Sequence, residues 1–308
     1  MAFENLKPKV VAPLDPTFQP LALYRREYRK MLADQAVRLM IGLKRGEGDI
    51  STVELRILPL RHPMFSITPV YIERIIKFLL WQEGAFEVYV SGCDIVANHL
   101  RRAYSMDGER SFDVDFLQNR VYEKPFRIIE CPEDEFPRPA DISRDIGRHL
   151  DGCRIGFDLG ASDRKVSSVI NGKVVFSEEV VWEPKLHSDP DYHYREIVQA
   201  IGSAAGHLPR VDAIGGSSAG IYIDNEPRVA SLFRGVPLGR YGEIRSIFHR
   251  IQERFGVPLT VINDGDVTAL AGSMSLGVNS VIGIALGSSL AAGYINDHTV
   301  FVVGEIPY

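Results

Sequence analysis

The sequence predicts an α/β protein with two domains, and three observations carry this prediction. The chain has 308 residues, 45% of them hydrophobic, which at ~150 residues per domain is enough for two ordinary cores. Strand-like and helix-like patterns alternate along it. Residues 131–140 contain three prolines and an acidic cluster, a composition typical of a linker. We therefore predict an extended arm at 1–20, an N-terminal domain at 21–130, a linker at 131–150 and a C-terminal domain at 151–308.

The N-terminal domain is predicted to be a smaller α/β or α+β unit of unknown role. Its first two strands flank LysArgGlyGluGlyAsp, whose two glycines indicate a hairpin turn. The hairpin, helix and strand, followed by Ser91 and Gly92, leave two interpretations open: a decayed duplicate of the later domain, or a chance recurrence of a common order. The expected elements are a helix at 21–33, strands at 36–43 and 51–58, a helix at 70–82, a strand at 86–90, a helix at 94–104 and short strands within 112–129.

The C-terminal domain begins with three consecutive strands. Asn171 and Gly172 join the second and third strands, and this dipeptide is a strong short hairpin signal. Helices and strands alternate after it, which is the order of a ribonuclease-H-like lobe of the actin-like ATPase and sugar-kinase type. The expected strands are 154–159, 165–170, 174–182, 213–216, 259–262 and 281–285, and the expected helices are 194–205, 242–255 and 267–274.

Composition narrows the classes of function. The net charge is −5 and no polybasic run occurs, so nucleic acid is an unlikely partner. The three cysteines stand singly, without a CxxC pair, which predicts a reduced, zinc-free protein. The N-terminus lacks a signal-peptide layout and no apolar run approaches ~20 residues, so we expect a cytoplasmic protein without a membrane partner.

The first candidate site lies at the tip of the first hairpin of the C-terminal domain. Asp158 stands at a strand end, followed by Gly160, the hydroxyl of Ser162 and Lys165. A residue without a Cβ lets backbone amides approach a phosphate, and the carboxylate can hold a magnesium-bound water. The alternative is that Asp and Gly here only form a turn.

The second candidate site is the junction between a strand and a helix at residues 262–272. Asp264 follows the strand directly and so lies near the helix N-terminus, where ligands collect in α/β sheets. This placement suits a general base. The alternative role is capping of the helix, which we prefer for Asp266 and not for Asp264.

The third candidate site is a turn of small residues between two strands, at Gly287, Ser288 and Ser289. Small residues permit close approach of a phosphate. A tightly packed hairpin explains the same pattern. Elsewhere, His187 and His193 flank Asp189 and Asp191 in a polar segment, which fits either a metal site or, as we prefer, a solvated loop.

These three motifs, in this order and spacing, resemble the ROK family of repressors and sugar kinases over about half of the chain. In that family an AspxGly turn with a following Lys forms a first phosphate loop. An AsnAsp dipeptide supplies a sugar contact and the catalytic Asp, and a Gly-rich turn forms a second phosphate loop. The resemblance implies a first loop at Asp158, Gly160, Ser162 and Lys165, a sugar contact at Asn263, a base at Asp264, a second loop at Gly287, Ser288 and Ser289, and a sugar cleft lined by Gly220 and Glu305.

The sequence also departs from the family pattern. Ala161 replaces a glycine of the first loop, the second loop lacks two further glycines, and residues 230–235 contain no sugar-binding Asn. The GluxGlyHis segment is matched only loosely around Glu305, and the cysteine-rich zinc motif is absent. The chain ends before most of a second lobe, so we expect either a fragment or a substitute lobe supplied by the N-terminal part.

The resemblance implies an ATP-dependent sugar kinase with Asp264 as base and Mg near Asp158, acting on a sugar and a nucleotide, with pairing into a homodimer. The alternatives are a non-catalytic sugar or nucleotide sensor with eroded phosphate loops, and an inactive fragment. The family's regulators carry a basic recognition helix, and the helix expected at 70–82 is too apolar for that role.

Overall fold

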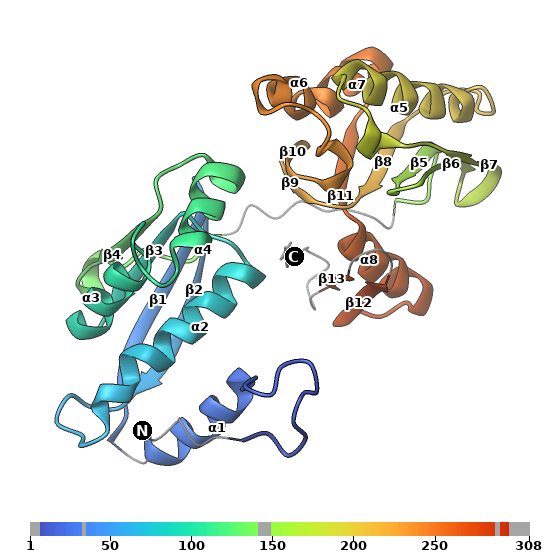
Figure 1. Ribbon diagram of the computed structural model, residues 1–308. Coiled ribbons are helices and arrows are strands. Elements are labelled where there is room, and N and C mark those ends of the chain that lie inside the picture. Colours follow the sequence, from blue (N-terminus) through green and yellow to red (C-terminus); the bar gives the residue numbers. More distant parts are fainter. Residues whose placement is uncertain (1–6, 33–34, 141–148, 287–289, 296–308) are drawn as a thin grey trace. The chain divides into compact units, whose positions relative to one another are not determined.

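The computed structural model of the protein describes residues 7–32, 35–140, 149–286 and 290–295 (Figure 1). The chain divides into two compact units, Met1–Ile142 and Ser143–Tyr308, which we call the N-terminal and C-terminal units. Among the described residues, no helix is long and apolar enough to cross a membrane.

The N-terminal unit is built on a four-stranded sheet with the order β2-β1-β3-β4. The predicted hairpin is confirmed: β1 runs antiparallel to β2, and Gly48 in its turn has a φ of 73°. β1 is also antiparallel to β3, whereas β3 and β4 are parallel. The strands are β1 (Val37–Gly46), β2 (Asp49–Ile57), β3 (Glu87–Ser91) and β4 (Arg127–Glu130).

Helices complete the core of this unit. The strand prediction for residues 112–129 is wrong except at β4, because residues 111–122 are helical. Val114, Leu117 and Val121 recur at helical spacing and are all buried, so the segment packs one face into the core. The helices are α1 (Leu21–Leu32), α2 (Thr68–Gln82), α3 (Asp94–Ala103), α4 (Ser111–Asp115) and the π-helical η3 (Phe116–Tyr122).

Part of the region predicted as a linker packs on the N-terminal sheet. Ala140 and Ile50 exchange two backbone hydrogen bonds of 2.8 and 3.0 Å. A Cβ added at Gly42 would lie 3.3 Å from the Phe136 ring, so the glycine lets this segment lie close to β1.

The C-terminal unit contains a five-stranded sheet with the order β11-β8-β5-β6-β7. Strands β5, β6 and β7 form an antiparallel meander, and β8 and β11 add to it in parallel. This arrangement confirms the ribonuclease-H-like fold. The two units differ in strand direction, since β5 pairs parallel to β8 while β1 pairs antiparallel to β3, which favours chance recurrence over duplication. The strands are β5 (Cys153–Leu159), β6 (Asp163–Ile170), β7 (Lys173–Val181), β8 (Ala213–Ser218) and β11 (Leu259–Asn263).

Local sequence signals explain several boundaries of this unit. The predicted AsnGly turn joins β6 and β7, with φ values of 48° at Asn171 and 78° at Gly172. The helix predicted at 242–255 is divided at Ser246 into α6 (Tyr241–Arg245) and α7 (Ile247–Phe255). Gly256 then ends α7 in the left-handed conformation.

One face of the five-stranded sheet carries the core. Ile155 and Phe157 of β5 pack with Ile197 of α5 (Pro190–Ala205) and Phe248 of α7 in one buried cluster. Figure 1 shows α5, α6 and α7 gathered beside these strands. A short hairpin of β9 (Ile221–Ile223) and β10 (Glu226–Val229) follows β8. Because α5, α6 and α7 cover the core face, they leave the other face of the sheet available to a site.

Helix α8 (Asp264–Leu276) lies directly on a second hairpin, formed by β12 (Val281–Leu286) and β13 (Leu290–Ile295). A Cβ added at Gly283 would lie 2.2 Å from the backbone nitrogen of Ala269, and one at Gly293 would lie 2.4 Å from Cα of Asp266. Glycine at both positions thus permits contact between the two backbones.

Candidate functional site

A cleft of ≈ 1060 Å³ opens on the face of the five-stranded sheet that α5 and α7 do not cover, and residues of α8 form part of its wall. Its floor is a row of small residues that pair across all five strands: Thr260, Gly215, Gly156, Ser167 and Ser177. A Cβ added at Gly215 would meet nothing within 4 Å. The floor therefore has open space above it and carries hydroxyl groups.

Asp158 and Asp264 both line this cleft. Asp158 lies near the carboxyl end of β5, and Asp264 follows the carboxyl end of β11, with β8 between the two strands. Because these three strands are parallel, both carboxylates stand at the same edge of the sheet. Burial raises the pKa of Asp264, and the nearby charge of Asp158 raises it further.

The predicted first phosphate loop is a tight turn between β5 and β6. The Gly160 amide donates to the Asp163 carbonyl at 2.9 Å, and a Cβ at Gly160 would approach that oxygen to 2.9 Å. The Ser162 hydroxyl contacts the Asp163 carboxylate at 3.1 Å. Lys165 is the cross-strand partner of Asp158, and its Nζ lies 2.8 Å from Asp163 Oδ1. Gly160 and Lys165 line the cleft.

Asn263 and Gly220 contact one another. Asn263 is the N-cap of α8: its Oδ1 accepts from the Gly265 amide at 2.7 Å, and its Nδ2 donates to the Gly220 carbonyl at 2.9 Å. Both ends of the Asn263 amide are thus engaged within the protein. Gly220 has a φ of 132° and does not line the cleft as described.

The expectation that Asp266 caps α8 is wrong, since Asn263 performs this role. Asp266 is 1% exposed, and neither of its carboxylate oxygens has a hydrogen-bond partner among the described residues. Burial, together with the charge of Asp264, raises the pKa of Asp266 to about 7. A carboxyl group that holds a proton near neutral pH therefore lies two residues from Asp264.

Four predicted site residues lie outside the described residues: Gly287, Ser288, Ser289 and Glu305. The flanking residues Ala285 and Leu286 line the cleft.

Sequence reasoning missed several residues of the cleft. Lys185 and Ser231 line it from two single 3-10 turns, Pro184–Leu186 and Ser231–Phe233, whose sequences carry no ligand motif. Gly215, Ser167 and Ser177 lie on three different strands. Because successive side chains of a strand point to opposite faces, a small residue on the cleft face of each strand was the signal that the sequence offered. Their meeting in one row depends on pairing between strands, which no local pattern reveals.

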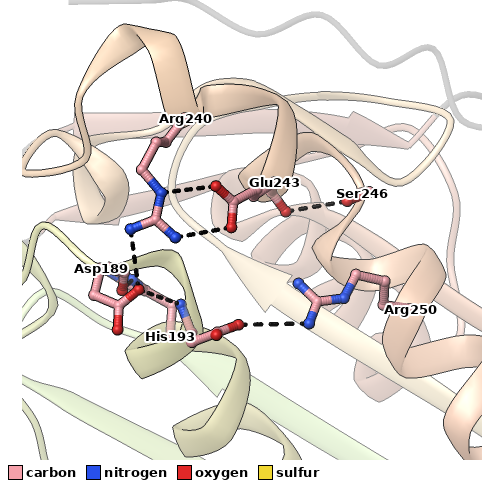
Figure 2. Close-up of polar contacts among 7 residues, drawn as sticks. Asp189, His193, Arg240, Glu243, Ser246 and Arg250 are labelled. Carbon is pink, nitrogen blue, oxygen red and sulfur yellow. Dashed lines mark hydrogen bonds and ion pairs between the residues drawn. The ribbon is translucent and has the colours of Figure 1, made fainter.

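The polar segment 187–193 is not a solvated loop throughout, which corrects the sequence interpretation: Asp189 is the N-cap of α5, and Asp191 and His193 lie in its first turns. His193 is fully buried; its ring nitrogens lie 3.0 Å from the Pro184 carbonyl and 3.3 Å from the Asp189 carbonyl, and burial lowers its pKa. Figure 2 shows Asp189 in contact with Arg240, which also pairs with Glu243. Among the described residues, no His, Cys, Asp and Glu side chains gather into a group of three that could hold a metal ion.

Comparison with known proteins gives similarity in structure only. No family model matches the chain, and no curated protein matches it. An inorganic polyphosphate/ATP-glucomannokinase from Arthrobacter sp. strain KM is 21% identical over 49% of this chain and 60% of its own, with a TM-score of 0.40. A ROK hexokinase from Thermus thermophilus is 17% identical over 48% of each chain, with a TM-score of 0.38.

A ROK family transcriptional regulator, a homologue of the E. coli MLC protein, is 21% identical over 51% of this chain and 40% of its own, with a TM-score of 0.37. The matched region thus spans 60% or less of each of these three proteins.

Proposed function

We propose that the C-terminal unit binds a phosphate donor and a sugar, and that it transfers a phosphoryl group to a sugar hydroxyl. The observation that carries this proposal is the meeting of Asp158 and Asp264 at one edge of the sheet, in a cleft that Gly160 and Lys165 also line. The kinds of protein similar to this chain, sugar kinases among them, agree with the proposal.

Asp264 is the proposed general base. A base removes the proton from the attacking hydroxyl most effectively when its pKa lies near the working pH. The raised pKa of Asp264, which results from burial and from Asp158, moves it in that direction. The amide of Gly265 donates to Asp264 Oδ1 at 3.1 Å, which restricts the rotation of the carboxylate.

Asp158 is the proposed partner of magnesium, through water. Mg²⁺ commonly keeps several waters and is held by one or two carboxylates together with substrate phosphates. A cleft with two aspartates and no larger group of metal ligands among the described residues fits that mode of binding. When bound, the ion would offset the negative charge of the phosphates. Gly160 and Lys165 would position the phosphate chain beside it.

The test is Asp264→Asn in the full chain, with titration calorimetry for Mg·ATP and a panel of hexoses and N-acetylated amino sugars, followed by a phosphoryl-transfer assay. We expect wild-type turnover and a fall of ~10²-fold or more in kcat for the variant, with binding retained. Asp151→Asn is the matched control, because that side chain is 83% exposed and lies outside the cleft.

The second candidate function is a non-catalytic sensor of sugar or nucleotide. It is favoured by the engagement of Asn263 and Lys165 in contacts within the protein. Saturable binding without turnover in the wild type would support the sensor and contradict the kinase. Absence of binding to both ligand classes would contradict both proposals.

A further inference from the structure

Two lysines line the cleft, and they differ in their surroundings. The Nζ of Lys165 lies 2.8 Å from Asp163 and 3.9 Å from Glu179. Lys185 is half-buried and forms no ion pair with a described residue. The charge of Lys165 is therefore shared with two carboxylates, whereas that of Lys185 has no counter-ion in the part of the chain that the structure describes.

The backbone of Lys185 is held firmly. It lies in a single turn, η5 (Pro184–Leu186), whose first carbonyl contacts the ring of the fully buried His193 at 3.0 Å. A Cβ added at Gly235 would lie 2.9 Å from the Lys185 carbonyl, so the glycine there lets the neighbouring loop pack against this turn. A fixed backbone reduces the ordering cost when the side chain contacts a ligand.

The segment that carries Lys185 also holds the first loop. The Trp182 amide donates to the Ser162 carbonyl at 3.1 Å, and its indole Nε1 donates to the Gly160 carbonyl at 3.0 Å. Trp182 is 3% exposed, so this anchor is buried. Lys185 follows three residues later and lines the same cleft as Gly160.

We propose that Lys185 contacts the phosphate chain of the donor in this cleft. The inference rests on the proposed function and names the residue that recognises the donor. Asp158 and Asp264 repel a polyanion, and Lys165 offsets them only in part because it is already paired. An ammonium group without a counter-ion binds phosphate as a point charge, with no ion pair to break first. The same chemistry suits a nucleoside triphosphate and inorganic polyphosphate.

The test compares Lys185→Met with Lys173→Met in the full chain. Lys173 is exposed at the start of β7 and does not line the cleft, so it controls for the loss of one positive charge from the unit. Titration calorimetry would use Mg·ATP in one arm and sodium tripolyphosphate in the other, at two salt concentrations. Thermal unfolding would establish that both variants fold.

We expect Lys185→Met to weaken binding at least 10-fold and to reduce its salt dependence, while Lys173→Met leaves both unchanged. Weaker binding of Mg·ATP identifies a nucleotide donor, and weaker binding of tripolyphosphate identifies a polyphosphate donor; either supports the inference. Wild-type affinity in the Lys185→Met variant overturns the inference and leaves the proposed function intact. A wild-type chain that binds neither compound overturns both.

Discussion

Buried carboxylates of the two units differ in whether they have a charged or hydrogen-bonding partner. In the N-terminal unit, Glu73 is 3% exposed and contacts His99 at 2.6 Å and Arg110 at 2.9 Å. Asp113 in the same unit is 2% exposed and contacts Lys77 at 3.0 Å and Trp81 at 2.8 Å. In the C-terminal unit, Asp266 is 1% exposed and has no such partner among the described residues.

This difference distinguishes a carboxylate with a structural role from one that lies in a candidate site. A buried charge is tolerated when a cation and hydrogen bonds compensate it, and an uncompensated one holds a proton instead. Glu73 links α2 and α3 to the residue before α4, which is a structural role. The uncompensated group lies two residues from Asp264, the proposed base, and the charge of Asp264 contributes to its raised pKa.

Breaking the compensated contacts of Glu73 should produce the largest change in the free energy of unfolding. Glu73→Gln removes the charge that Arg110 and His99 face, so we expect the free energy of unfolding of the N-terminal unit to fall by ~3–5 kcal/mol. The chain has two tryptophans, and Trp81 is the one in this unit, so its fluorescence during urea unfolding in a Trp182→Phe background measures the loss.

Glu27→Gln is the control for that experiment, because Glu27 pairs with Arg26 and Lys30, both of them well exposed. We expect its unfolding midpoint to stay near that of the parent. Equal losses in the two variants would contradict the contrast between compensated burial and surface pairing.

Removing the uncompensated charge of Asp266 should raise the stability of the C-terminal unit at neutral pH, the opposite of the effect expected for Glu73→Gln. The pKa of Asp266 is raised from 3.8 to about 7, so the folded state binds the proton more tightly. The contribution of Asp266 to the stability of the wild type should therefore fall as the pH rises from about 4 to about 7, by about 1.4 kcal/mol per pH unit and about 4 kcal/mol in all. Asp266→Asn mimics the neutral form, so it should match the wild type near pH 4 and exceed it at pH 8.

Urea unfolding followed through Trp182 at several pH values measures this difference, in a Trp81→Phe background. Asp191→Asn, a change at a half-exposed carboxylate outside the cleft, should leave the pH dependence unchanged. If Asp266→Asn and the wild type show parallel pH profiles, Asp266 has a partner that balances its charge in solution.

Two neighbouring glycines of β8 extend the comparison to the two faces of the sheet, with a smaller effect. A Cβ at Gly216 would lie 2.2 Å from the Phe157 ring in the core, whereas one at Gly215 would meet nothing within 4 Å. We expect Gly216→Ala to cost ~1–3 kcal/mol through overpacking. Gly215→Ala should change stability by less than ~0.5 kcal/mol, because it faces the open cleft.

Thermal unfolding of both glycine variants, with ligand titration for Gly215→Ala, completes this test. A loss of stability in Gly215→Ala equal to that in Gly216→Ala would mean that the cleft face is covered in solution.

Several features could be predicted from the sequence because their causes are local. The AsnGly turn needs only two residues with positive φ, and the β5-β6-β7 meander follows from it and from alternation. Asp158 and Asp264 stand at strand ends that the pattern identifies, so their arrival in one cleft was foreseeable.

Other features were not predictable because they depend on distant residues. Residues 111–122 contain Phe, Val and Tyr, which favour strands, and only burial of one helical face decides for helix. The burial of Asp266 depends on a hairpin whose glycines contact the backbone of α8. The position of Lys185 depends on the contacts of Trp182 and His193.

By itself, the sequence determined the ribonuclease-H-like order of strands and helices, the AsnGly hairpin and the two aspartates at strand ends, since each depends on backbone preferences over a few residues. Only the tertiary structure decided which charges are compensated. Desolvation and Coulomb interaction depend on distances between segments far apart in the chain. Whether the charges of Asp266 and Lys185 are compensated therefore depends on neighbours that no local pattern specifies.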